Sequence, residues 1–102
     1  MSFADLQHSV AHGAAPPAGS TLAVQALWHD ARGDWERAHA AVQQAEQDRA
    51  CAWVHAYLHR KEGDIGNAGY WYSRAGRLLP AKGTSLEAEW SEIARALTAS
   101  QD

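Results

Sequence analysis

The sequence predicts an all-α protein, and three observations support this fold class. Apolar residues recur at the three- and four-residue spacing of helices in successive segments, and no segment keeps the two-residue alternation of a strand. Glycine, proline, serine and aspartate stand at the expected segment ends, where they stop one helix or cap the next. A Gly-Asp pair occurs at 33–34 and again at 63–64, so a helix–turn–helix unit is repeated.

The composition is that of one folded domain covering residues 1–102. The hydrophobic fraction is 46% and the charged fraction 21%, both ordinary for a globular chain. The net charge of −3 disfavours phosphate backbones and anionic lipid, so we expect neither a nucleic acid nor a membrane partner. Cys51 is the only cysteine, which excludes an intrachain disulfide and is typical of a reducing compartment. The start of the chain does not resemble a signal peptide, and a cytoplasmic location is predicted.

The first three helices are delimited by local signals. Ser2 and Asp5 are spaced as a capping box for the first helix, and the proline-containing run 13–19 ends it. The second helix is expected over 20–33, with the serine at its start as cap. The third is expected over 34–47 and begins at the aspartate of the first Gly-Asp pair.

The last three helices follow the same rules. The fourth is predicted over 48–62, and the fifth begins at Asp64 and ends before Pro80. Thr84 and Glu87 are spaced as a capping box for the C-terminal helix. Its apolar stripe consists of Leu86, Trp90, Ile93 and Leu97.

The sequence also predicts roles for two glycines of the fifth helix and for the acidic residues of the last helix. Gly66 and Gly69 are expected to allow close helix packing. Glu87, Glu89 and Glu92 are expected to form one solvated face of the last helix.

The repeated unit resembles a tetratricopeptide repeat. Residues 56–68 match its first helix, its Gly-Asp turn and the small residue that opens its second helix, and Tyr72, Ala75 and Pro80 match later motif positions. An upstream copy matches at Ala26, Gly33, Asp34, Trp35, Ala38, Val42 and Ala45. The resemblance implies two antiparallel hairpins, about 20–47 and 48–79, flanked by an N-terminal helix and a C-terminal capping helix. The repeat offset of 30 is shorter than the usual ~34 residues, which puts the stacking angle in doubt.

This resemblance also implies a protein- or peptide-binding module. In tetratricopeptide repeats the first helix lines a groove, and here the matching face carries Trp53, Tyr57 and Arg60, to which Trp71 and Arg74 are added as candidate ligand-binding residues. The alternative is that these aromatic side chains pack in the core or at a subunit interface. The segment 55–75 is also similar to uncharacterised small proteins of bacteria and fungi, which implies no activity.

The histidines offer a second class of site. His55 and His59 are four residues apart and therefore share one face of a helix, as metal ligands do. A third ligand would come from Glu62, His29 or Asp30. The alternative reading is a set of half-buried structural histidines, and no cofactor is predicted. A small-molecule pocket lined by His29, His55, His59, Trp71 and Arg74 is the competing hypothesis for binding or catalysis.

No phosphate loop, dinucleotide fingerprint or nucleophile motif is present in the sequence. Cys51 lies on an apolar stripe and is expected to be a structural thiol. The sequence therefore favours a non-enzymatic helical-repeat interaction module. Because a short solenoid exposes apolar end faces, we expect a homodimer.

Overall fold

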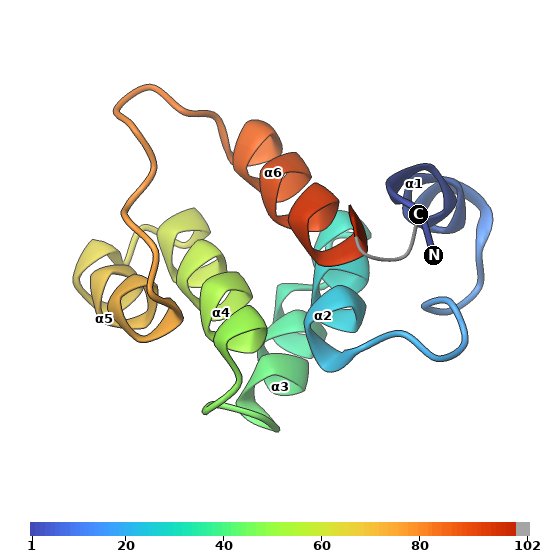
Figure 1. The fold of residues 1–102 in the computed structure, drawn as a ribbon, viewed down its shortest axis with the longest axis horizontal. Coiled ribbons are helices and arrows are strands. Elements are labelled where there is room, and N and C mark those ends of the chain that lie inside the picture. The colour runs from blue at the N-terminus through green and yellow to red at the C-terminus, as the bar shows by residue number, and fades with distance from the viewer. Residues whose placement is uncertain (100–102) are drawn as a thin grey trace.

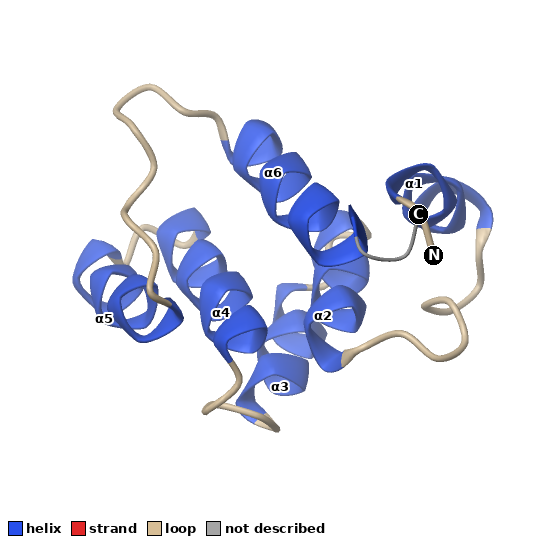
Figure 2. Cartoon of the chain, in the orientation of Figure 1, coloured by secondary structure: helices blue, strands red, loops and turns tan. Residues whose placement is uncertain are grey.

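The computed structural model describes residues 1–99 and contains six helices and no strand in that range, which confirms the all-α prediction (Figure 2). The helices are α1 (Phe3–His12), α2 (Leu22–Ala31), α3 (Trp35–Gln43), α4 (Arg49–Lys61), α5 (Ile65–Ala75) and α6 (Leu86–Thr98). None of these described helices has the length and apolarity needed to cross a membrane.

Two helical hairpins, α2–α3 and α4–α5, form around the repeated Gly-Asp turns. Gly33 and Gly63 have φ angles of 81° and 88°, a left-handed conformation that glycine adopts without steric cost. The aspartate after each glycine accepts a hydrogen bond from the amide three residues later and so caps the second helix. Ala38 and Ala68, one turn further on, are fully buried where the paired helices meet. The turns predicted from the repeat are confirmed.

Gly66 and Gly69 do not have the packing role expected of them. A Cβ atom built on either residue would meet no neighbouring atom within 4 Å. Both lie inside α5, where neither has a positive φ angle. The expectation that these glycines allow close helix packing was therefore wrong.

The two kinds of glycine predict opposite responses to alanine. Gly63→Ala is expected to lower the free energy of unfolding by about 1 kcal/mol, because alanine is strained at positive φ. Gly66→Ala is expected to raise it by about 0.5–1 kcal/mol, because alanine favours a helix interior and has open space there. Urea unfolding followed by circular dichroism measures both variants. A destabilised Gly66→Ala protein would contradict the assignment of open space.

Two helix caps differ from those expected. The Ser20 hydroxyl donates to the Pro17 carbonyl and does not cap the helix. Thr21 caps α2 instead. At α6 the cap is Ser85, whose hydroxyl accepts from a backbone amide at 3.0 Å, and not Thr84. In both cases a neighbouring residue of the same chemical type takes the role.

Helix α3 ends earlier than expected, whereas α5 ends before Pro80, as predicted. α3 stops at Gln43 and not near Gln47, because the following amides form tighter bonds to carbonyls three residues back. α5 stops at Ala75, well before Pro80, because Gly76 takes the left-handed conformation with φ of 71°. The chain from 76 to 85 is consequently a connection to α6 without helix.

Helix α4 is the centre of the molecule. It packs against α2, α3, α5 and α6 (Figure 1), and every residue from Cys51 to His59 is buried. A helix that is buried on all sides needs a neighbour on each face, which the second hairpin alone does not provide. The additional neighbour is α6, which lies along α4 and α2 on the face opposite α3 and α5 (Figure 1).

Helix α1 closes the other end of the assembly. It begins with the predicted capping box, in which the Ser2 hydroxyl and the Asp5 carboxylate each accept from the other residue's amide. It packs against α2 and α6. The indole N–H of Trp28 donates to the Ser9 hydroxyl at 3.1 Å, which joins α1 to the first hairpin.

Candidate functional site

The five residues predicted to bind a ligand lie on two opposite sides of α4. Trp53, Tyr57 and Arg60 face α6, whereas Trp71 and Arg74 belong to α5 and lie on the side of the histidines. The combined stacking site suggested for these residues is therefore not assembled by the fold.

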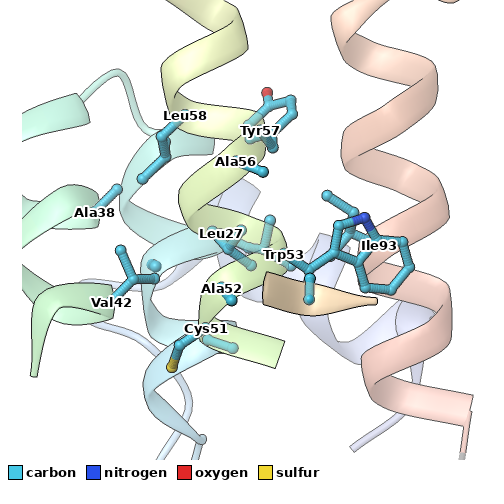
Figure 3. Packing of buried hydrophobic residues seen from close by; sticks show 14 of the residues in the cluster. Leu27, Ala38, Val42, Cys51, Ala52, Trp53, Ala56, Tyr57, Leu58 and Ile93 are labelled. Atoms are coloured by element: carbon cyan, nitrogen blue, oxygen red, sulfur yellow. The ribbon is translucent and has the colours of Figure 1, made fainter. Parts of the chain in front are cut away.

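Helix α6 covers the predicted groove stripe. Trp53 and Tyr57 are only 5% and 2% exposed. Figure 3 shows Trp53 projecting from α4 toward Ile93 of α6. The Arg77 guanidinium lies 3.8 Å from the centre of the Trp53 ring and covers it further. The face of the hairpins that carries this stripe is accordingly covered by a helix of the same chain.

A polar network is buried beneath the first turns of α6. The Tyr57 hydroxyl donates to one oxygen of the Asp30 carboxylate at 3.0 Å, and the Lys61 ammonium donates to the other at 2.9 Å. Asp30 is 3% exposed, so both of its oxygens are paired as buried charges require. Burial, with Asp30 nearby, raises the pKa of the Tyr57 hydroxyl far above its ordinary value, so Tyr57 stays protonated.

A second buried network joins α4, α5 and α6. The Arg60 guanidinium donates to Glu89 at 2.9 Å and also to the Thr84 carbonyl. The Tyr72 hydroxyl donates to the second Glu89 oxygen. Glu89 is only 1% exposed, so the expectation of a solvated acidic face was wrong for this residue, although Glu87 and Glu92 are exposed. Arg60 is an ion-pair partner within the fold and not a free basic rim.

A pocket of about 460 Å³ remains beside the start of α6. It is lined by Asp30, Tyr57 and Lys61 and by Leu86 and Trp90 of α6. Helix α6 thus leaves part of this face uncovered, and solvent reaches the polar network from this side.

Three histidines come together on the opposite face of α4, and we call them the histidine cluster: His39, His55 and His59. Ring centres are 4.8 Å apart for His39 and His55, 5.2 Å for His39 and His59, and 4.9 Å for His55 and His59. One ring nitrogen of each lies within 4.8 Å of the others. The Nε2 atoms of His39 and His55 are 3.0 Å apart. This arrangement places three potential metal ligands around one point.

Tryptophans hold two of these rings in place. Trp35 stacks on His39 with ring centres 4.7 Å apart and an interplanar angle of 12°. Trp71 stacks on His55 at 3.9 Å and 15°. The Trp35 indole N–H donates to the Leu58 carbonyl at 2.9 Å, which fixes the Trp35 ring to α4.

The third ring is oriented by a carboxylate. His59 Nδ1 lies 2.6 Å from Glu62 Oε1, and because Glu62 can only accept when ionised, Nδ1 carries the proton. The lone pair of His59 is then on Nε2. A histidine held through its other nitrogen by a carboxylate is the usual arrangement of metal-bound imidazoles.

His29 is not part of the cluster, although it was predicted together with His55 and His59. It packs edge-on against Trp28 in α2, with ring centres 5.3 Å apart. The third member is His39, which the sequence interpretation missed because its contact with His55 spans 16 residues and joins two hairpins. The available signal was the four-residue spacing of Trp35 and His39, which puts an aromatic and an imidazole on one face of α3.

Burial keeps two members of the cluster, His39 and His55, uncharged. Desolvation, together with the neighbouring imidazoles, lowers the pKa of His55 from 6.5 to about 4. Desolvation and His59 also lower the pKa of His39. Both rings are therefore neutral near pH 7, where each retains a lone pair.

Acid should destabilise the metal-free protein through His55. Its folded pKa of about 4 lies below the unfolded value of 6.5, so the unfolded chain takes up the proton first as pH falls. We expect up to about 3 kcal/mol of stability to be lost between pH 6.5 and 4, with no further loss from this group below that range. Urea unfolding across this range in a chelator measures the loss. His55→Phe should remove the corresponding part of the slope, and an unchanged slope would contradict the lowered pKa.

Cys51 is 2% exposed, as its apolar stripe suggested. Burial, reinforced by the Asp48 carboxylate, raises the pKa of its thiol to about 12. The thiol is therefore protonated near neutral pH and unsuited to nucleophilic chemistry.

Comparison with known proteins supplies no assignment. No known protein family, curated protein or solved structure matches the chain. The resemblance to tetratricopeptide repeats therefore stays a prediction, and the functional argument depends on the geometry alone.

Proposed function

We propose that this protein is a non-enzymatic interaction module whose concave face, formed by α2 and α4, binds an amphipathic helix of a partner protein. The observation that carries the proposal is the position of α6, a helix of thirteen residues that lies along both α2 and α4. A face that accommodates one helix is complementary to others of similar chemistry. The buried free thiol of Cys51 favours action in the cytoplasm.

The contacts of α6 define the chemistry of the partner helix. The Trp90 indole N–H donates to the Leu27 carbonyl of α2 at 3.0 Å, and Ile93 is fully buried. Glu89 meets the Arg60 guanidinium, a cation that α4 presents to α6. A competing helix would carry a large apolar stripe and one glutamate placed to meet Arg60.

Release of α6 is the step that would open the face. The segment 76–85 joins α6 to α5 without regular helix, and Leu78 within it is 92% exposed. The hairpin contacts α2–α3 and α4–α5 do not involve α6. The pocket beside Trp90 gives a partner access before α6 leaves completely.

A peptide competition experiment tests this proposal. A fluorescent peptide with the sequence of residues 84–98 is titrated with the full-length Trp90→Ala protein and with wild type, and anisotropy is recorded. We expect tighter apparent binding to Trp90→Ala, because its own α6 occupies the face for a smaller fraction of time. The same peptide carrying Glu89→Arg should bind at least about tenfold more weakly, since it brings a second cation against Arg60.

Two results would overturn the proposal. One is the absence of binding by a Trp90→Ala protein that circular dichroism shows to be folded. The other is equal binding of the parent and Glu89→Arg peptides, which would mean nonspecific adhesion.

Light scattering on wild type also tests the predicted homodimer, in which α6 of a second copy would be the occupant.

A further inference from the structure

We propose that the histidine cluster is a binding site for a divalent transition metal ion of the zinc class, with His39, His55 and His59 as its protein ligands. The site lies on the face of α4 opposite α6 and is separate from the proposed helix-binding face. Two ligands come from consecutive turns of α4 and the third from α3, so the ion would join the two hairpins.

The spacing of the rings fits such an ion. Two Zn–N bonds of ~2.05 Å at a tetrahedral angle place their nitrogens about 3.3 Å apart. The Nε2 atoms of His39 and His55 are 3.0 Å apart, and one nitrogen of His59 lies within 4.8 Å of both. Coordination by all three rings would require the His59 nitrogen to move closer to this pair.

A purely structural hydrogen-bond network explains the cluster less well. His55 is 2% exposed, and its Nδ1 has no hydrogen-bond partner among the described residues, so the hydrogen bonds of the fold do not account for this ring completely; an ion on Nε2 would leave Nδ1 unchanged. Its Nε2 faces the Nε2 of His39. If this contact is a hydrogen bond, one of the two nitrogens must carry a proton, and only the other keeps a lone pair. Buried polar clusters that serve only the fold normally satisfy each member. An ion between the rings would use the lone pairs that converge there.

The surroundings favour a dication. Glu62 holds His59 through Nδ1 and makes the ring a stronger ligand. Nε2 is then the nitrogen left for an ion, which would take the place of its 3.4 Å contact with the Asn67 amide nitrogen. The carboxylates of Glu36, Glu46 and Glu62 make the electrostatic potential at His39 more negative, which favours a cation there. Stacking on Trp35 and Trp71 fixes the two other rings before an ion arrives, which reduces the entropic cost of binding.

The ligand chemistry determines which ions fit. Three neutral imidazoles suit Zn²⁺, Co²⁺, Ni²⁺ and Cu²⁺, whereas Ca²⁺ and Mg²⁺ prefer oxygen ligands. His39 is only half-buried, so a water molecule can reach the fourth position. A second group, His59, Glu62 and Asp64, also lies close together, but Asp64 already caps α5 and Glu62 already holds His59. The three histidines are therefore the better set.

Calorimetric titration of Zn²⁺ into the chelator-treated, untagged full-length protein tests the site. We expect one ion per chain. His39→Ala should weaken binding by more than about 100-fold, because it removes one of three ligands. Glu62→Gln changes an exposed residue and should weaken binding by about 10–100-fold through the orientation of His59. The absorption spectrum of the Co²⁺ form should show the visible bands of a tetrahedral site in wild type and lose them in His39→Ala.

The matched control is the other histidine pair with four-residue spacing. His8 and His12 in α1 have ring centres 4.7 Å apart and could bind metal adventitiously. The double variant His8→Ala/His12→Ala should keep the stoichiometry and affinity of wild type. Loss of binding in this variant, with retention in His39→Ala, would overturn the proposal. So would the absence of a saturable Zn²⁺ site in wild type. Neither result bears on peptide binding at the α6 face.

Discussion

Replacement of Glu89 by alanine is expected to lower the free energy of unfolding by about 3–5 kcal/mol. Glu89 is 1% exposed and accepts hydrogen bonds from Arg60 and Tyr72. Its removal leaves the Arg60 guanidinium, itself largely buried, without its carboxylate partner. A buried charge that loses its partner costs far more than an exposed pair contributes.

Urea unfolding monitored by circular dichroism measures this loss. Glu92→Ala is the matched control, because Glu92 is on the same helix and exposed, and its change should stay within about 0.5 kcal/mol. The double variant Arg60→Met/Glu89→Leu should recover much of the stability, since it removes both charges together. If Glu89→Ala and Glu92→Ala unfold at the same urea concentration, the buried ion pair is absent in solution.

Replacement of Trp53 by alanine should also cost about 3–5 kcal/mol. The indole is 5% exposed and lies between α4 and α6, and deletion of a large aromatic side chain in a core leaves a cavity that packing fills only in part. The Arg77 guanidinium above the ring loses its cation–π contact as well.

The control for Trp53 is Tyr70→Ala. Tyr70 is an aromatic residue of α5 that is 53% exposed, so its loss should cost much less than that of Trp53. Thermal unfolding of the two variants gives the comparison. A stable Trp53→Ala protein would mean that the residue is available at an open surface, as the groove hypothesis supposed, and that α6 does not cover it in solution.

These two residues show how one helix changes the functional interpretation. From the sequence, Trp53 and Arg60 appeared as the wall and rim of an open groove. With α6 in place, both belong to an interface that stabilises the fold. Under the proposed function they have both roles, because the contacts that hold α6 are those that a partner helix would replace.

The sequence alone was sufficient for the all-α class and for both hairpins. The signals that specify them are local: a glycine at positive φ ends one helix, and the aspartate after it caps the next. Such interactions span three or four residues and depend little on the rest of the chain. The same locality explains why helix ends were displaced by a few residues, since Thr21 and Ser85 are chemically equivalent to their neighbours as caps.

Only the tertiary structure decided which residues form sites. The contact between His39 and His55 joins two hairpins, and the pair of Arg60 with Glu89 joins residues 29 positions apart. Neither follows from spacing along one helix, because both depend on how α3 and α6 are placed around α4. That placement is determined by burial of the whole α4 surface, a property of the assembled helices and not of any segment.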